Sequence, residues 1–156
     1  MVFLAQKFDT MVEGRNNRTD SIHGAVHALR DMGGITFVTL RTRHGLVQCV
    51  CTHKEALDGA TEECAVTASG LWRTEPRAPG GMELTDAKLT VLSRPAAPPP
   101  VPLSKKKLSL NLDTELALRP VVLRTPRERA VFRIQAGICR AFRDFLQSQD
   151  FTEIHT

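Results

Sequence analysis

Four cysteines and a nearby histidine are the residues whose types could bind a metal ion. The cysteines are Cys49, Cys51, Cys64 and Cys139, and His53 follows the first pair. Cys49 and Cys51 stand two residues apart, whereas a zinc clamp typically uses C-x-x-C spacing. Residues two apart on a strand share one face, so the pattern favours reduced thiols packed in a core. A zinc site that uses His53 is the alternative.

A large aromatic residue occupies an unexpected face of a predicted strand. The stretch GGITFVTLR (33–41) predicts a strand that begins after two glycines. By two-residue alternation, Val38 and Leu40 lie on one face and suit a core, whereas Phe37 lies on the opposite face. Phe37 therefore either packs under the loop 74–81 or offers an exposed ring to a ligand.

Length and composition indicate an ordinary globular protein. The chain has 156 residues, of which 42% are hydrophobic and 24% charged, enough for one domain or for two if one is small. It has no apolar run of about 18 residues, so no membrane-spanning helix is expected. The opening MVFLAQK is too short for a secretory signal, so we expect a cytoplasmic protein. The net charge of +4 permits a polyanionic partner without requiring one.

Before residue 94 the sequence predicts five short strands separated by turn signals. One helical turn is expected at 53–59, between the third strand and the fourth. This order is typical of an OB-fold, a mainly β, five-stranded Greek-key barrel, although an SH3-like or other small barrel fits the same pattern. The strands are expected at 21–30, 35–43, 46–52, 64–73 and 82–92.

After the barrel the sequence predicts a linker and one long amphipathic helix. The segment 94–102, RPAAPPPVP, favours an extended polyproline II spacer. The lysines at 105–107 are typical of a solvated tract, and a contact with phosphate is the alternative. Thr125–Pro126–Arg127–Glu128 predicts a capped helix start. Apolar residues then recur at helical spacing over about 22 residues, and this wide stripe needs a partner surface.

Two long stretches resemble one enzyme family. GAVHALRDMGGITFVTLRTRHGLVQCV (24–50) is similar to the anticodon-binding OB domain of aspartyl-tRNA synthetases of the archaeal and eukaryotic cytosolic type, and asparaginyl-tRNA synthetases have a related barrel. PRERAVFRIQAGICRAFRDFLQSQDFTEIHT (126–156) is similar to the first-motif helix of their class II catalytic domain. The resemblance implies an anticodon-binding domain at 1–93, a proline- and lysine-rich linker at 94–111 and an incomplete catalytic domain at 112–156.

The same resemblance assigns four residues to anticodon binding. Phe37 matches an aromatic residue that stacks on an anticodon base, an interaction worth roughly 1–3 kcal/mol per base. Arg30 matches an arginine that contacts the anticodon, and Gln48 matches a glutamine that reads a base edge. Glu83 matches a glutamate that hydrogen-bonds an anticodon base. Without the resemblance, Phe37 would simply pack under the loop 74–81. Gln48 and Glu83 would be solvated strand residues, and Arg30 a surface charge. The loop 74–81 contains no residue that we can match to the family's anticodon-reading loop.

The resemblance also implies that this chain alone does not aminoacylate tRNA. The family's second and third motifs, which hold ATP and magnesium, have no counterpart here, so we expect no cofactor and no metal in this chain. The segment 112–124 departs from the family's charged pattern, with Glu115 at an expected arginine and Val122 at an expected aspartate. Both an excised part of a full enzyme and a truncated paralogue fit these features.

Three functions stay open at this point. The chain is the tRNA anticodon-binding part of an aspartate–tRNA ligase, a protein-interaction module that uses the helix at 127–149, or a general single-strand binder. The resemblance and the apolar stripe both suggest a homodimer through that helix, although the helix could instead fold back on the barrel. Specificity for aspartate tRNA alone and for aspartate and asparagine tRNA both fit the sequence.

Overall fold

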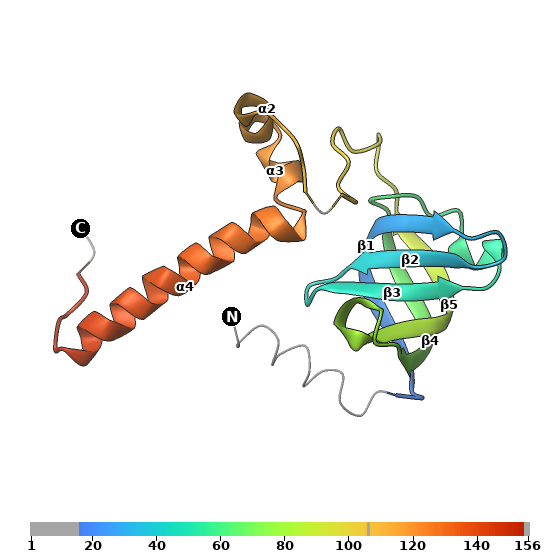
Figure 1. Cartoon of the computed structure of the whole chain (residues 1–156), viewed down its shortest axis with the longest axis horizontal. Coiled ribbons are helices and arrows are strands. Elements are labelled where there is room, and N and C mark those ends of the chain that lie inside the picture. Colours follow the sequence, from blue (N-terminus) through green and yellow to red (C-terminus); the bar gives the residue numbers. More distant parts are fainter. Residues whose placement is uncertain (1–15, 106, 155–156) are drawn as a thin grey trace. The chain divides into compact units, whose positions relative to one another are not determined.

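The computed structural model describes residues 16–105 and 107–154, which form two compact units that divide between Pro100 and Val101 (Figure 1). The division falls inside the predicted linker 94–111, so residues 101–111 of that segment belong to the second unit. The opening MVFLAQK and the middle lysine of the 105–107 tract lie outside the described residues. Within the described ranges, no helix is long and apolar enough to cross a membrane.

The first unit is a closed five-stranded barrel, as the OB-fold prediction requires. The strands lie in the order β1-β2-β3-β5-β4, and β4 closes the barrel by pairing with β1. All neighbours are antiparallel except β3 and β5, which are parallel. A 3-10 turn, η1, follows β3 where a helical turn was predicted. The bounds are β1 Thr19–Asp31, β2 Thr36–Arg41, β3 Leu46–Cys51, η1 Lys54–Leu57, β4 Ala65–Thr74, η2 Pro79–Gly81 and β5 Met82–Ser93.

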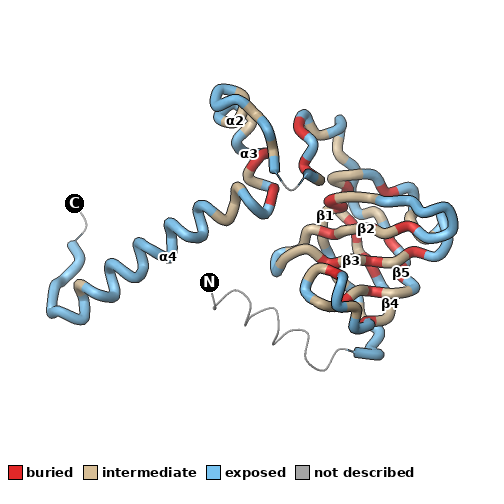
Figure 2. The backbone as a smooth tube through the Cα atoms, in the orientation of Figure 1, coloured by how far each residue is buried: buried red, intermediate tan, exposed pale blue. Residues whose placement is uncertain are grey.

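Alternate residues of the strands fill the barrel, as Figure 2 shows along β2 and β3. Val38 and Leu40 are completely buried, whereas Phe37 lies partly buried on the outer face, as the alternation predicts. Cys49 and Cys51 are buried free thiols, in agreement with the prediction of packed cysteines. Burial raises the pKa of Cys51 to about 11, so this thiol stays neutral.

The two-residue alternation expected of a strand fails in β1 at a β-bulge. The pairing of β1 with β2 shifts between Val26 and Ala28, so Val26 and His27 are both buried. A bulge adds one residue to one strand and rotates the residues that follow. His27 Nδ1 lies 3.4 Å from Arg41 Nη1, and Arg41 pairs with Glu63 at 2.8 Å. Periodicity alone could not reveal this buried polar cluster.

The second unit contains three helices, α2 (Leu112–Ala117), α3 (Arg119–Val122) and α4 (Pro126–Ser148). The predicted long helix is confirmed as α4, which has 23 residues. The two short helices were not predicted. Asn111 caps the start of α2, since its side chain accepts a hydrogen bond from the Thr114 backbone N–H at 2.8 Å. The small core of this unit consists of Val101, Leu103 and Val122.

The predicted side-chain cap at the start of α4 does not form. Thr125 occupies the N-cap position, but its side chain makes no capping hydrogen bond. Its hydroxyl instead donates to the Val122 carbonyl at 2.9 Å. Thr125 is buried at the end of α3, so its hydroxyl satisfies a carbonyl of the preceding helix rather than an N–H of the following one.

Candidate nucleic-acid interface

The strand register brings the four predicted residues to one outer face of the barrel. Arg30 on β1 stands opposite Phe37 on β2, and Gln48 on β3 stands opposite Glu83 on β5. All four line one open hollow of about 360 Å³, together with Val50 and two residues of the loop between β4 and β5. Residues from four strands that are separated in sequence by up to 53 positions (83 − 30) therefore share a single site.

Arg30 and Phe37 form a stacked pair at one side of the hollow. The guanidinium carbon of Arg30 lies 5.0 Å from the centroid of the Phe37 ring, which is within the range of a cation–π contact. Arg30 is exposed and Phe37 is partly buried. Both a guanidinium and an aromatic ring can stack on a nucleic-acid base, so this pair offers a flat surface suited to an unpaired base.

Gln48 and Glu83 form a hydrogen-bonded pair across the parallel strands. Gln48 Nε2 donates to Glu83 Oε2 at 2.8 Å, and this bond fixes which end of the amide faces the carboxylate. Neither Gln48 Oε1 nor Glu83 Oε1 has a hydrogen-bond partner among residues 16–105 and 107–154, although Glu83 and Arg77 attract each other by charge. The pair therefore presents two acceptors, which suits a base edge that carries N–H donors.

The loop between β4 and β5 contributes Glu75 and Arg77, which the sequence analysis did not predict. Arg77 Nε donates to Glu75 Oε1 at 3.0 Å, and the Arg77 backbone N–H donates to the same oxygen at 3.1 Å. These bonds, the side-chain bond above all, hold the pKa of Glu75 below its ordinary value. The hollow thus carries two guanidinium groups and two carboxylates, and each carboxylate accepts a hydrogen bond from a neighbouring side chain.

The described part of the chain brings no three histidine, cysteine, aspartate or glutamate side chains together in an arrangement that could hold a metal ion. The stacking pair and the paired amide and carboxylate suit hydrogen bonding and stacking with bases rather than bond-breaking chemistry.

Comparison with known proteins agrees with this geometry. Residues 21–92 match the family model of an OB-fold nucleic acid binding domain. The chain is 41% identical over 133 residues to an aspartate–tRNA(Asp/Asn) ligase of Thermus thermophilus, covering 85% of this chain and 31% of that protein. It is 35% identical over 143 residues to the ligase of the same name from Archaeoglobus fulgidus, and the match covers 87% of this chain and 33% of that protein.

A solved structure has a similar fold. The aspartyl-tRNA synthetase of Entamoeba histolytica matches with a TM-score of 0.76 at 25% identity, covering 96% of this chain and 38% of that one. The chain spans about a third of the length of the curated relatives described above. Residues 21–92 therefore match an OB-fold nucleic acid binding domain, and the chain is similar to about a third of the length of aspartate–tRNA ligases.

Proposed function

We propose that the barrel binds the anticodon loop of a tRNA of the aspartate type. The observation that carries this proposal is the convergence of Arg30, Phe37, Gln48 and Glu83 in one hollow on the outer face of the barrel. A stacking platform beside a fixed pair of acceptors is what recognition of a splayed-out, single-stranded base requires. The names of the relatives support tRNA as the nucleic acid.

Each side chain has a distinct part in this proposal. An anticodon base stacks on the Arg30–Phe37 pair, because both groups present flat faces there. Gln48 Oε1 and Glu83 Oε1 accept hydrogen bonds from a base edge, while the bond between these two side chains keeps both acceptors in place. A carboxylate beside RNA repels phosphate, so Glu83 contributes specificity rather than affinity.

Nuclear magnetic resonance tests where the RNA binds. We expect addition of an anticodon stem-loop of aspartate tRNA to shift the Gln48 side-chain amide and the Arg30 Nε–H signals. Signals of the exposed residues Ser69 and Lys88, which pair across β4 and β5 away from the hollow, serve as the control. Shifts at Ser69 and Lys88, with none at Gln48 or Arg30, would contradict the proposal.

We propose further that the chain serves a cytoplasmic aspartate–tRNA ligase. In that proposal the ATP- and magnesium-dependent aminoacylation belongs to the full-length enzyme, and this chain alone is inactive. The support is that the relatives are tRNA ligases of which this chain covers about a third. A pyrophosphate-release assay with aspartate, ATP and magnesium tests the second statement, and measurable turnover by the purified chain would contradict it.

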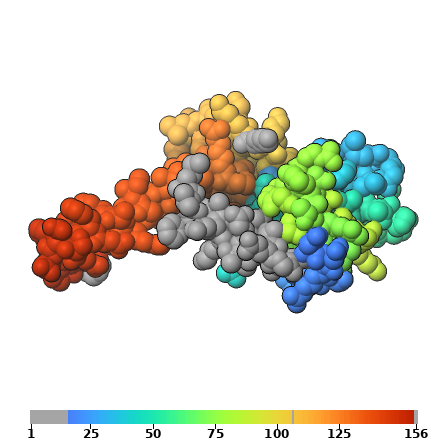
Figure 3. Space-filling view, turned by 60° about the horizontal axis from the view of Figure 1, so that its bottom comes forward, coloured from blue at the N-terminus to red at the C-terminus, as the bar shows by residue number. Residues whose placement is uncertain are grey.

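A homodimer through α4 is a second part of the proposal. Ile134, Ile138 and Phe142 follow one another at helical spacing and are each between 63% and 65% exposed, and no described residue covers them. Figure 3 shows one face of α4, coloured orange to red. An apolar stripe of this length on a water-exposed helix favours association.

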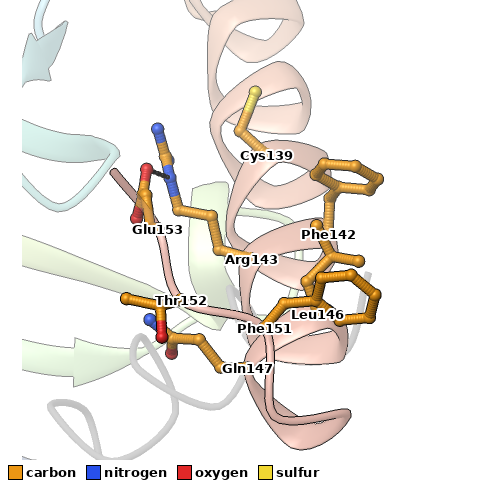
Figure 4. Close-up of a pocket in the computed structure, with 8 residues that line it drawn as sticks. All are labelled: Cys139, Phe142, Arg143, Leu146, Gln147, Phe151, Thr152 and Glu153. Atoms are coloured by element: carbon orange, nitrogen blue, oxygen red, sulfur yellow. Dashed lines mark hydrogen bonds and ion pairs between the residues drawn. The ribbon is translucent and has the colours of Figure 1, made fainter. Parts of the chain in front are cut away.

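The C-terminal end of α4 extends this apolar surface. The chain reverses after the helix, and Arg143 Nε donates to Glu153 Oε1 at 2.9 Å. Figure 4 shows this pair on one side of the helix end and the rings of Phe142 and Phe151 on the other. The residues drawn there line a hollow of about 330 Å³. The side of this hollow that Phe142 and Phe151 line is apolar and can bind apolar side chains of a partner.

A further inference from the structure

The loop between β4 and β5 holds an arginine in a fixed direction beside the candidate site. Glu75 N donates to Gly81 O at 3.0 Å and Ala78 N donates to Glu75 O at 2.9 Å, so the loop closes on itself. Ala78 is only 5% exposed and anchors the loop on the barrel. These bonds fix the backbone on both sides of Arg77, which lies between Glu75 and Ala78.

Arg77 combines exposure with an imposed orientation. Its side chain is 91% exposed, whereas that of Glu75 is only 26% exposed. Glu75 binds the Arg77 backbone N–H and guanidinium Nε, so one carboxylate fixes both ends of the arginine. An exposed arginine ordinarily samples many rotamers, and fixing it in advance reduces the entropy lost on binding. Arg77 Nη2 lies 3.5 Å from Glu75 Oε2, and the exposed guanidinium lines the same hollow as Phe37 and Gln48.

We propose that Arg77 binds a phosphate of the RNA backbone next to the bases held in the hollow, and that Glu75 is the positioning residue for it. This inference rests on the proposed function, since it takes RNA as the ligand. A guanidinium with several N–H groups suits phosphate oxygens. A contact with phosphate places the strand without reading its sequence, in contrast to Gln48 and Glu83.

Salt dependence separates a phosphate contact from a base contact. The measurement is anisotropy of a labelled anticodon stem-loop, titrated with the full 156-residue chain at several salt concentrations. We expect Arg77→Ala to weaken binding about fivefold at low salt and to reduce the slope of log K against log salt by about 0.7, the value for one phosphate on a single strand. The loss should be equal for the native loop and for a loop with its central base altered.

Arg43→Ala is the matched control, because Arg43 is also exposed, lies in the turn between β2 and β3 and does not line the hollow. Equal effects of Arg77→Ala and Arg43→Ala would overturn the inference. So would an Arg77→Ala variant that changes the preference between the two loops, since Arg77 would then read bases. If the wild-type chain itself shows no preference between the loops, the proposed function fails instead.

Glu75→Ala tests the positioning role, because it removes the oxygen that accepts from the Arg77 backbone N–H and from Arg77 Nε. Its two effects on binding have opposite signs: removing a carboxylate near RNA strengthens binding, whereas releasing Arg77 weakens it. We expect Glu75→Ala to weaken binding in the wild-type chain but not in the Arg77→Ala background. Stronger binding of Glu75→Ala in both backgrounds would show that Glu75 only repels RNA, and the positioning role would be wrong.

Discussion

Replacing Phe37 with alanine should weaken RNA binding strongly while leaving the barrel folded. The ring is partly buried on the outer face and contacts the Arg30 guanidinium, but it is not part of the barrel core. Loss of one base-stacking platform corresponds to about 1–3 kcal/mol, or roughly a 5- to 150-fold rise in Kd. The free energy of unfolding should fall by less than the ~3–5 kcal/mol typical of a buried Phe→Ala change.

The two effects need separate assays and matched variants. Anisotropy with a labelled anticodon stem-loop gives Kd, and urea unfolding followed by Trp72 fluorescence gives stability, because Trp72 is buried in the core. Val50→Ala is the control for binding, since Val50 pairs with Phe37 and lines the same hollow without an aromatic ring. Leu40→Ala is the control for stability, because Leu40 is fully buried. An unfolded Phe37→Ala chain, or one with unchanged Kd, would refute the reasoning.

Three further predictions follow from other parts of the structure. Gln48→Ala and Glu83→Gln should each reduce the preference for the native anticodon loop over an altered one; an unchanged ratio of Kd values would argue against base reading. Burial, with the charge of Arg41, lowers the pKa of His27 from 6.5, although Glu63 and Glu62 act in the opposite direction. As the pH falls, His27 therefore takes up its proton at a higher pH in the unfolded chain than in the folded chain. The free energy of unfolding should stay constant above about pH 6.5 and decline below it. Urea titrations at several pH values check this, and an equal decline in His27→Gln would exclude His27 as its source. Ile138→Asp should convert a dimer to a monomer in sedimentation velocity without loss of helix by circular dichroism; a wild-type chain that is monomeric at high micromolar concentration would rule out the α4 dimer.

Sequence patterns were sufficient for the barrel because burial enforces alternation on its strands. Thr36, Val38 and Leu40 face inward, and a shift of one residue would turn this set to solvent. The position of Phe37 on the outer face follows from the same alternation. The proximity of Phe37 to Glu83 does not follow from alternation, because the closed barrel and the parallel pairing of β3 with β5 bring these distant segments together.

The features that the sequence did not predict depend on local geometry rather than on periodicity. The bulge at Val26–Ala28 buries His27 against the alternation. Arg77 enters the hollow only because the loop closes through Glu75 and Ala78. Asn111, which caps α2, is a residue type that indicates the start of a helix. Helices of 6 and 4 residues, however, are too short to show a hydrophobic period.

The most direct test of the central claim is a titration of the chain with the anticodon stem-loop of aspartate tRNA and with a copy altered at the central base. Anisotropy of the labelled RNA is the appropriate signal. The arrangement of Arg30, Phe37, Gln48 and Glu83 predicts a preference for the native loop of about tenfold or more, near 1.4 kcal/mol. Equal affinity for the two loops would contradict base recognition and leave only the attraction of a basic surface for RNA.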